Sequence, residues 1–203
     1  MRFFTELVTM NYLAHAYLSF NQPDLLVGNM ISDFVKGKKK FDYSEGIQKG
    51  IALHRAIDAF TDEHECTKTA KEVFRPAYRL YSAAFLDVVF DHFLATDVNH
   101  FSNESLKQFA THTYGTLELR KEIFPERFAR MFPYMKEQNW LYNYHTRWGI
   151  EKSLGGVVRR SVYLTESDTA FRLFEQEYDF LKRCYEQFFP QLYAFAKEES
   201  EKL

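Results

Sequence analysis

The sequence predicts an all-α protein built as a single-domain helical bundle. Apolar residues recur mostly at intervals of three and four, which is the spacing of an amphipathic helix. The 203 residues contain only 8 Gly and 5 Pro, too few for a turn-rich β-sandwich. Phe (21) and Tyr (13) contribute to a chain that is 46% hydrophobic, enough for a sizeable core. No repeat or Pro/Gly/Ser-rich linker divides it, so one domain is expected over residues 10–203, with 1–9 as an N-terminal extension.

The expected helices follow from these periodic stretches and from the breaks between them. They span residues 10–20, 24–36, 43–63, 67–72, 75–97, 102–120, 124–136, 139–155 and 166–200. The breaks are NQPD (21–24), GKKKFD (37–42), RP (75–76), FP (124–125) and YLTESD (163–168). In the last break, Thr165 followed by Asp168 predicts a capping box. The segment 83–97 is apolar on every side, which is typical of a central helix enclosed by others.

Bulk composition argues against several classes of partner. The net charge is −2, so no basic excess indicates nucleic acid. The two cysteines cannot form a disulfide framework, which favours a reducing, cytoplasmic location. No apolar run is long enough for a membrane span, and the N-terminus lacks the features of a secretion signal. Membrane insertion is therefore not expected, and the oligomeric state is left open.

The stretch IALHRAIDAFTDEH (51–64) carries His54, Asp58 and Asp62 at four-residue steps. On a helix these side chains lie along one side, about 40° apart. They could form a solvated stripe, a buried ion-pair network or one wall of a metal site. His54 and Asp58 share the face of the neighbouring isoleucines, which disfavours the solvated stripe, whereas Asp62 lies nearer the boundary.

Three other segments carry polar pairs with the same spacing. They are Asn11 with His15, Asn29 with Asp33, and Asp87 with Asp91, which His92 follows directly. A buried carboxylate is costly unless it is paired or bound to a cation, and metal sites in helical bundles are formed by such inward side chains. Mixed nitrogen and oxygen ligands suit Mn²⁺, Fe²⁺ or Zn²⁺ better than Ca²⁺. The structural alternatives are a core histidine at His15, an ion pair at Asp91 and a cap or ion pair at Asp87.

Two basic clusters could hold an anion. The lysines of KGKKK (36–40) form either a solvated loop or part of a site, and Arg159 and Arg160 either end a helix or clamp a phosphate. No Gly-rich phosphate loop, nucleophile elbow or CxxC pair is present. Hydrolysis by a metal-activated water is the enzymatic chemistry that these residues permit.

Several ordered motifs resemble the acyl carrier protein phosphodiesterases, also called acyl carrier protein hydrolases. The resemblance runs from Met10 to about Arg160, through MNYLAHAYLS, GNMISDFVKGK, GIALHRAIDAFTDEH, DVVFDHFLA and NWLYNYHTRWGIEKSL followed by RR. Such enzymes are similar to the helical HD-type metal phosphohydrolases. The resemblance implies cleavage of the phosphodiester between 4′-phosphopantetheine and a serine of acyl carrier protein, with Mn²⁺ expected first and Mg²⁺ or Fe²⁺ as alternatives.

The resemblance also implies which residues act. It places functional weight on Asp33, His54, Asp58, Asp91 and His92, of which we expect the first three to be catalytic. The expected metal ligands come from a set of six: His15, Asp33, His54, Asp58, Asp91 and His92. The expected substrate-binding residues are basic: Lys36, Lys38, Lys39, Arg55, Arg159 and Arg160. The order Asp91-His92 departs from the His-Asp order of HD enzymes, so their ligands do not transfer one by one.

Two rival functions remain at this level. One is a hydrolase of nucleotides or other small phosphodiesters, which would use the same chemistry without a protein substrate. The other is a non-catalytic helical binding protein, in which the polar pairs form a buried network.

Overall fold

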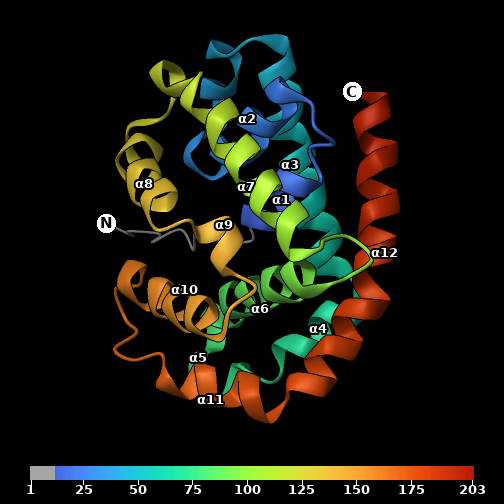
Figure 1. Cartoon of the computed structure of the whole chain (residues 1–203), viewed down its shortest axis with the longest axis vertical. Coiled ribbons are helices and arrows are strands. Elements are labelled where there is room, and N and C mark those ends of the chain that lie inside the picture. Colours follow the sequence, from blue (N-terminus) through green and yellow to red (C-terminus); the bar gives the residue numbers. More distant parts are fainter. Residues whose placement is uncertain (1–11) are drawn as a thin grey trace.

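The computed structural model describes residues 12–203, and all regular structure in that range is helical (Figure 1). The prediction of an all-α protein is confirmed. The predicted extension (1–9), Met10 and Asn11 lie outside the described residues. The α-helices are α1 (Tyr12–Tyr17), α2 (Pro23–Ile31), α3 (Glu45–Glu63), α4 (Glu65–Lys71), α5 (Arg75–Tyr78), α6 (Ser82–Thr96), α7 (Asn103–Glu118), α8 (Glu126–Glu137), α9 (Trp140–Asn143), α10 (Arg147–Arg160), α11 (Asp168–Gln176) and α12 (Tyr178–Lys202). Short 3₁₀ turns are η1 (Ser32–Phe34), η2 (Gly37–Asp42), η3 (Arg79–Tyr81) and η4 (Lys121–Ile123).

Helix α6 is the centre of the molecule, as its uniformly apolar sequence predicts. Every residue from Ala84 to Ala95 is buried, on all sides of the helix. Helices α1, α4, α10 and α12 pack around it. The long helix α12 runs down one side of the molecule against α3 and α4 (Figure 1). Burying each large apolar side chain of this core contributes about 1.5–3 kcal/mol.

Several expected helices are interrupted where the sequence gives no Gly or Pro signal. The expected helix 75–97 breaks at Arg79, whose φ of 49° is in the left-handed region. The last expected helix, 166–200, is two helices that divide at Glu177. The predicted capping box is wrong: at the start of α11 the Glu166 side chain accepts from the Thr169 N–H, and the Tyr78 hydroxyl of α5 accepts from the Ala170 N–H. A local side chain and a tertiary one thus share the capping of α11.

The contact between α2 and α3 depends on two glycines. A Cβ on Gly28 would lie 2.1 Å from the Ile47 carbonyl oxygen, and one on Gly50 would lie 2.4 Å from that of Leu25. The two backbones therefore touch directly. This contact matters for the site below, because η1 follows α2 directly and carries Asp33, while α3 carries His54 one turn after Gly50.

Gly50→Ala is expected to destabilise the protein by about 2 kcal/mol or more, because the added methyl group would push two backbones apart. The measurement is urea unfolding followed by circular dichroism. Gly115→Ala in α7 is the matched control, since a Cβ there meets nothing within 4 Å. That control should raise stability by about 0.5–1 kcal/mol through helix propensity. Equal effects of the two substitutions would contradict the contact.

Among the described helices, none combines the length and the apolar character that crossing a membrane requires.

Candidate metal centre

Two histidines and two carboxylates from three separate elements meet beside the α2–α3 contact. His15 comes from α1, Asp33 from η1, and His54 and Asp58 from α3. Asp58 uses both oxygens: Oδ1 lies 3.3 Å from His15 Nε2, and Oδ2 lies 3.2 Å from His54 Nε2. Asp33 Oδ1 is 3.2 Å from the same His54 Nε2. The four-residue step in α3 therefore places His54 and Asp58 on the inward face, as the helical wheel predicts.

The two imidazole rings stack face to face inside the protein. Their centroids are 3.9 Å apart with an interplanar angle of 16°. Both histidines are buried, whereas the Asp58 side chain is 33% exposed and the Asp33 side chain is 19% exposed. The carboxylates therefore face solvent and the histidines form the floor, so a small ion can reach the cluster from outside.

The protonation of this cluster follows from its charges. Burial by itself lowers the pKa of His54, but hydrogen bonds to Asp33 and Asp58 outweigh burial and raise that pKa to about 10. Burial, together with the neighbouring His54 charge, lowers the pKa of His15. Burial opposes ionisation of Asp58, yet its close contacts with the two histidines keep the pKa of its carboxyl well below the usual range. Without a metal, the cluster thus holds one proton on His54 between two carboxylates.

Unpaired nitrogen atoms indicate that this cluster suits a cation. His15 Nδ1, His15 Nε2 and His54 Nδ1 are buried without a hydrogen-bond partner, and the 3.3 Å approach of His15 Nε2 to Asp58 lacks hydrogen-bond alignment. Unpaired buried polar atoms are unfavourable and call for an explanation. Ligand atoms of His15, His54 and Asp58 all lie within 4.8 Å of one another. Imidazole and carboxylate donors at this separation fit a divalent metal ion.

Asp91 lies outside this cluster and binds the backbone of α1 instead. Its Oδ2 accepts from the Leu13 N–H at 3.0 Å and its Oδ1 from the Ala14 N–H at 2.9 Å. Asp91 therefore caps the N-terminus of α1 from α6, the end of a helix that favours a carboxylate. Burial raises the pKa of Asp91, and the two N–H donors oppose that rise. Because α1 carries His15 one residue after Ala14, Asp91 helps to hold His15 in place.

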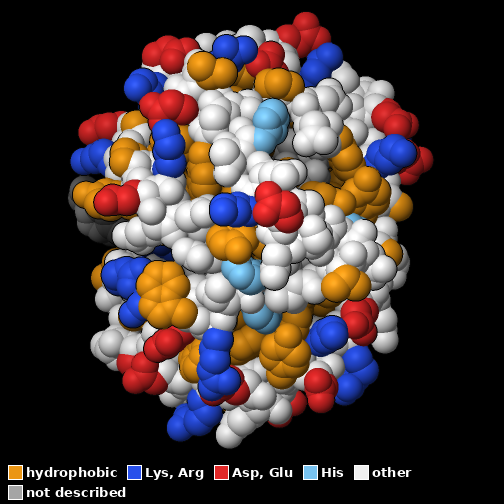
Figure 2. Space-filling model, in the orientation of Figure 1, with side chains coloured by type: hydrophobic (Ala, Val, Ile, Leu, Met, Phe, Trp, Pro, Cys, Tyr) orange, Lys and Arg blue, Asp and Glu red, His pale blue; other side chains and the backbone are white. Residues whose placement is uncertain are grey.

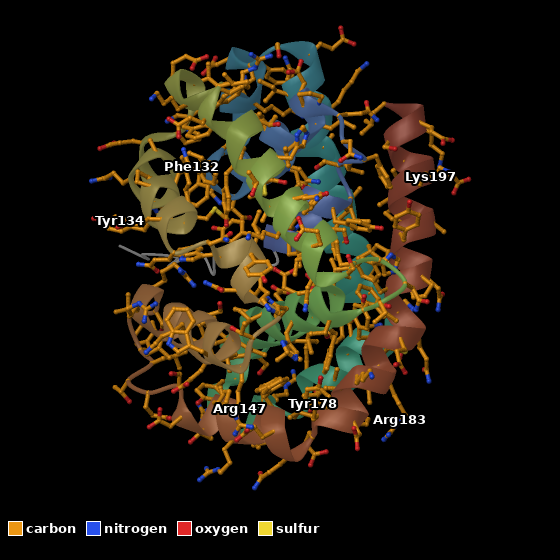
Figure 3. All side chains as sticks on the ribbon, viewed as in Figure 1. Phe132, Tyr134, Arg147, Tyr178, Arg183 and Lys197 are labelled. Atoms are coloured by element: carbon orange, nitrogen blue, oxygen red, sulfur yellow. The ribbon has the colours of Figure 1, made fainter. Side chains whose placement is uncertain are left out.

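His92 also lies outside the cluster. Its Nδ1 is 2.7 Å from the Tyr144 carbonyl oxygen, and its Nε2 is 3.4 Å from the hydroxyl of Tyr178, which Figure 3 labels at the start of α12. Burial lowers the pKa of His92 and favours the neutral ring. His92 follows Asp91 by about 100° around α6, so the two residues face different neighbours. We therefore leave both out of the proposed ligand set.

Asp87 is a buried carboxyl group of α6 on which the charge of Asp58 acts. It is 8% exposed, and the charges of Asp58, Lys71 and Asp62 act on it. Burial, followed by the negative charge of Asp58, raises the pKa of Asp87 well above its usual value. The sequence places Asp87 and Asp91 on one face of α6 and could not decide which of them faces α3. Asp62 lies at the rim, where it pairs with Lys71 at 2.6 Å.

The predicted substrate-binding residues fall into two groups. Lys36, Lys38 and Lys39 are exposed and follow Asp33 directly, and Arg55 donates to the Val35 carbonyl oxygen at 3.1 Å. Arg159 and Arg160 are exposed at the end of α10. One further cation near Asp33 was not predicted from the sequence. The Arg127 guanidinium of α8 lies 5.9 Å from the ring centroid of Phe34, the residue after Asp33. No motif around Arg127 signals this position.

In the metal-free protein, thermal stability is expected to fall as the pH rises from 6.5 toward about 10. Folded His54 holds its proton more tightly than unfolded His54, so its contribution is complete below pH 6.5 and lost as the pH passes about 10. His15 and Asp58, whose pKa values are lowered, act below pH 6.5 instead. The measurement is the melting temperature in EDTA across this range. His54→Gln should flatten the fall, the control His112→Gln at an exposed position of α7 should not, and equal slopes would contradict the assignment.

The fold and the site together define an all-α protein with a buried histidine–carboxylate cluster suited to a divalent cation. The family model described as acyl carrier protein phosphodiesterase matches residues 10–192. The chain belongs to this family.

Curated relatives agree with the family assignment. The protein named acyl carrier protein phosphodiesterase from Photorhabdus laumondii is 32% identical over 90% of this chain and 93% of its own length. The protein of that name from Enterobacter sp. is also 32% identical, over 93% of this chain and 98% of its own length. The protein of the same name from Yersinia enterocolitica is 31% identical over 93% of this chain and 98% of its own length. No solved structure matches the chain, so the likeness to HD-type enzymes stays a prediction.

Proposed function

We propose that this protein hydrolyses the phosphodiester that links 4′-phosphopantetheine to the serine of holo-acyl carrier protein, releasing apo-carrier protein and 4′-phosphopantetheine. Its family and the names of its relatives support this substrate. The observation that carries the chemistry is the cluster of His15, His54 and Asp58, with its buried, unpaired imidazole nitrogens.

His15, His54 and Asp58 would hold the cation, for which Mn²⁺ is our first candidate and Mg²⁺ or Fe²⁺ are alternatives. A divalent cation supplies Lewis acidity there, offsetting the negative charge of the phosphate and lowering the pKa of water. His54 must give up its proton to become a ligand, and the carboxylates within 3.2 Å of its Nε2 offset the positive charge that replaces that proton.

Asp33 is the proposed general base. Its side chain is 19% exposed, so it faces solvent at the mouth of the cluster rather than the floor. Asp33 Oδ1 can accept a proton from an attacking water and release it to solvent, to which it is exposed. Asp58, which engages both histidines, is a ligand and holds their orientation.

The basic group beside Asp33 would receive the carrier protein. Acyl carrier proteins are acidic, and Lys36, Lys38, Lys39 and Arg55 lie on the surface next to the carboxylates of the cluster. Such a rim raises the rate of association with an acidic partner and is weakened by salt. We therefore expect KM for holo-carrier protein to rise with ionic strength.

The deciding experiment incubates holo-carrier protein with metal-free enzyme, with and without added Mn²⁺, and follows the carrier by intact mass. Loss of the 4′-phosphopantetheine mass only in the presence of the cation, together with release of 4′-phosphopantetheine, supports the proposal. Unchanged holo-carrier beside hydrolysis of a small phosphodiester such as bis(4-nitrophenyl) phosphate would favour the small-substrate rival. No turnover, no bound metal and no thermal stabilisation by Mn²⁺ would favour a non-catalytic binding protein.

A further inference from the structure

A pocket between α9 and α10 contains both tryptophans of the chain. Its lining includes Trp140, Asn143, Trp148, Lys152, Arg159 and Arg160. Among the described residues that line it, none is acidic, whereas three are cationic. On the face drawn in Figure 2, hydrophobic side chains lie beside Lys and Arg side chains over α10. The pocket therefore combines aromatic surface with positive charge.

Trp148 gives this pocket an unusual wall. Trp148 is 55% exposed. Exposing a large apolar indole to water does not stabilise the fold. The wall is also rigid, because Gly149 packs against the backbone of Asn143 so closely that a Cβ would lie 1.8 Å from its carbonyl oxygen. An exposed indole on a fixed backbone, beside cations, is typical of a binding surface.

The pocket adjoins the metal centre through Tyr12 at the start of α1. The Tyr12 ring lies 6.3 Å from the Trp140 ring, between centroids. Burial raises the pKa of the Tyr12 hydroxyl, and the charges of Arg160 and of Asp33 both act on that pKa. Tyr12 is buried beside this wall of the pocket, and α1 carries His15 of the cluster three residues after it. A ligand that has its phosphate at the cluster can therefore extend past Arg160 into the pocket.

We propose that this pocket binds the pantetheine arm of the substrate, with Arg160 toward the phosphate and Trp148 packed against the arm. This assignment rests on the proposed function, in which the phosphate at the cluster carries an arm with two amides, a geminal dimethyl group and a terminal thiol. The indoles suit the apolar parts of that arm, and the side chains of Asn143, Gln138 and Ser153, which also line the pocket, suit its amides.

Intrinsic fluorescence reports on this pocket directly, because the two tryptophans that line it are the only ones in the chain. Titration of the full-length protein loaded with Mn²⁺ is expected to give a saturable change in emission with 4′-phosphopantetheine, and pantetheine without phosphate should give a weaker one. Inorganic phosphate alone should leave the emission unchanged. An unchanged emission at concentrations of 4′-phosphopantetheine that inhibit turnover would overturn the assignment.

Kinetics separate the arm from the carrier protein. Trp148→Ala is expected to raise KM for holo-carrier protein about tenfold, the loss of one good aromatic contact, and to leave kcat within about twofold. Inhibition by apo-carrier protein, which lacks the arm, should not change. Tyr134→Ala on α8 is the matched control: Tyr134 is 59% exposed, does not line the pocket, and should have no effect (Figure 3).

An unchanged KM in Trp148→Ala, or equal weakening of apo-carrier inhibition, would overturn the arm assignment while leaving the proposed function intact. Failure of the proposed function is seen separately, as intact holo-carrier after incubation with the wild-type protein. In that case the fluorescence titration with 4′-phosphopantetheine still decides whether the pocket binds the arm.

Discussion

Asp58→Asn is expected to lower kcat/KM for holo-carrier protein by about a thousandfold or more, the usual scale for loss of a group that holds a catalytic metal. Asp58 is the one carboxylate that engages both histidines of the cluster. An amide nitrogen in place of one oxygen cannot accept a hydrogen bond or act as a ligand, so one imidazole loses its partner. The metal bound per protein, measured by elemental analysis, should fall together with the activity.

Asp62→Asn is the matched control, one turn further along α3. Asp62 is also an aspartate of α3, like Asp58, but it lies at the surface and pairs with Lys71. We expect wild-type metal content and turnover within about twofold, since an exposed ion pair contributes little. Circular dichroism should show the same helical content in both variants. Full metal binding by Asp58→Asn would remove Asp58 from the ligand set and with it the centre proposed here.

Asp91→Ala is expected to produce the largest loss of stability, about 3–5 kcal/mol in urea unfolding of the metal-free protein. Asp91 is 0% exposed and accepts both N–H groups at the start of α1. Its removal leaves two buried donors without partners and a cavity in the core, and each unpaired donor costs about 1–3 kcal/mol. Asp91→Asn should lose less, because its one carbonyl oxygen still accepts one of the two bonds.

The contrast between Asp91 and Asp58 is the informative part of this measurement. Asp58→Asn should stay folded and lose metal, whereas the folded fraction of Asp91→Asn should retain metal with reduced stability. A stable Asp91→Asn variant that no longer binds metal would instead make Asp91 a ligand. Melting curves with and without Mn²⁺ on the same samples separate the two outcomes, since bound metal stabilises only a protein with an intact site.

Local sequence was sufficient for the helices and for one wall of the centre. The period of apolar residues identifies α3 and turns His54 and Asp58 inward, because a fixed rotation per residue determines which side chains share a face. The uniformly apolar sequence of α6 likewise indicates a central position. Both properties depend on neighbours within one or two turns, and these are visible in the sequence.

The same reasoning could not separate Asp87 from Asp91. The two residues share one face of α6, and a helix enclosed on all sides offers no polar face as a reference. Which carboxylate faces α3 and which one caps α1 depends on the height at which α1 crosses α6, a matter of tertiary packing. The positions of Arg127 and of the pocket containing Trp148 also could not be predicted from the sequence. Both lie on segments more than 90 positions from Asp33, and no shared motif connects them.

The sequence by itself determined the helical class, the inward direction of His54 and Asp58, and, through its motifs, the family. Tertiary structure alone decided that His15 completes the cluster with Asp58, that Asp91 and His92 serve neighbouring helices, and that a tryptophan-lined pocket adjoins the site. The physical reason is range: helix periodicity is set by bonds between residues four apart, whereas a metal centre is set by how separate helices pack, and here that packing depends on the direct contact of Gly28 with Gly50.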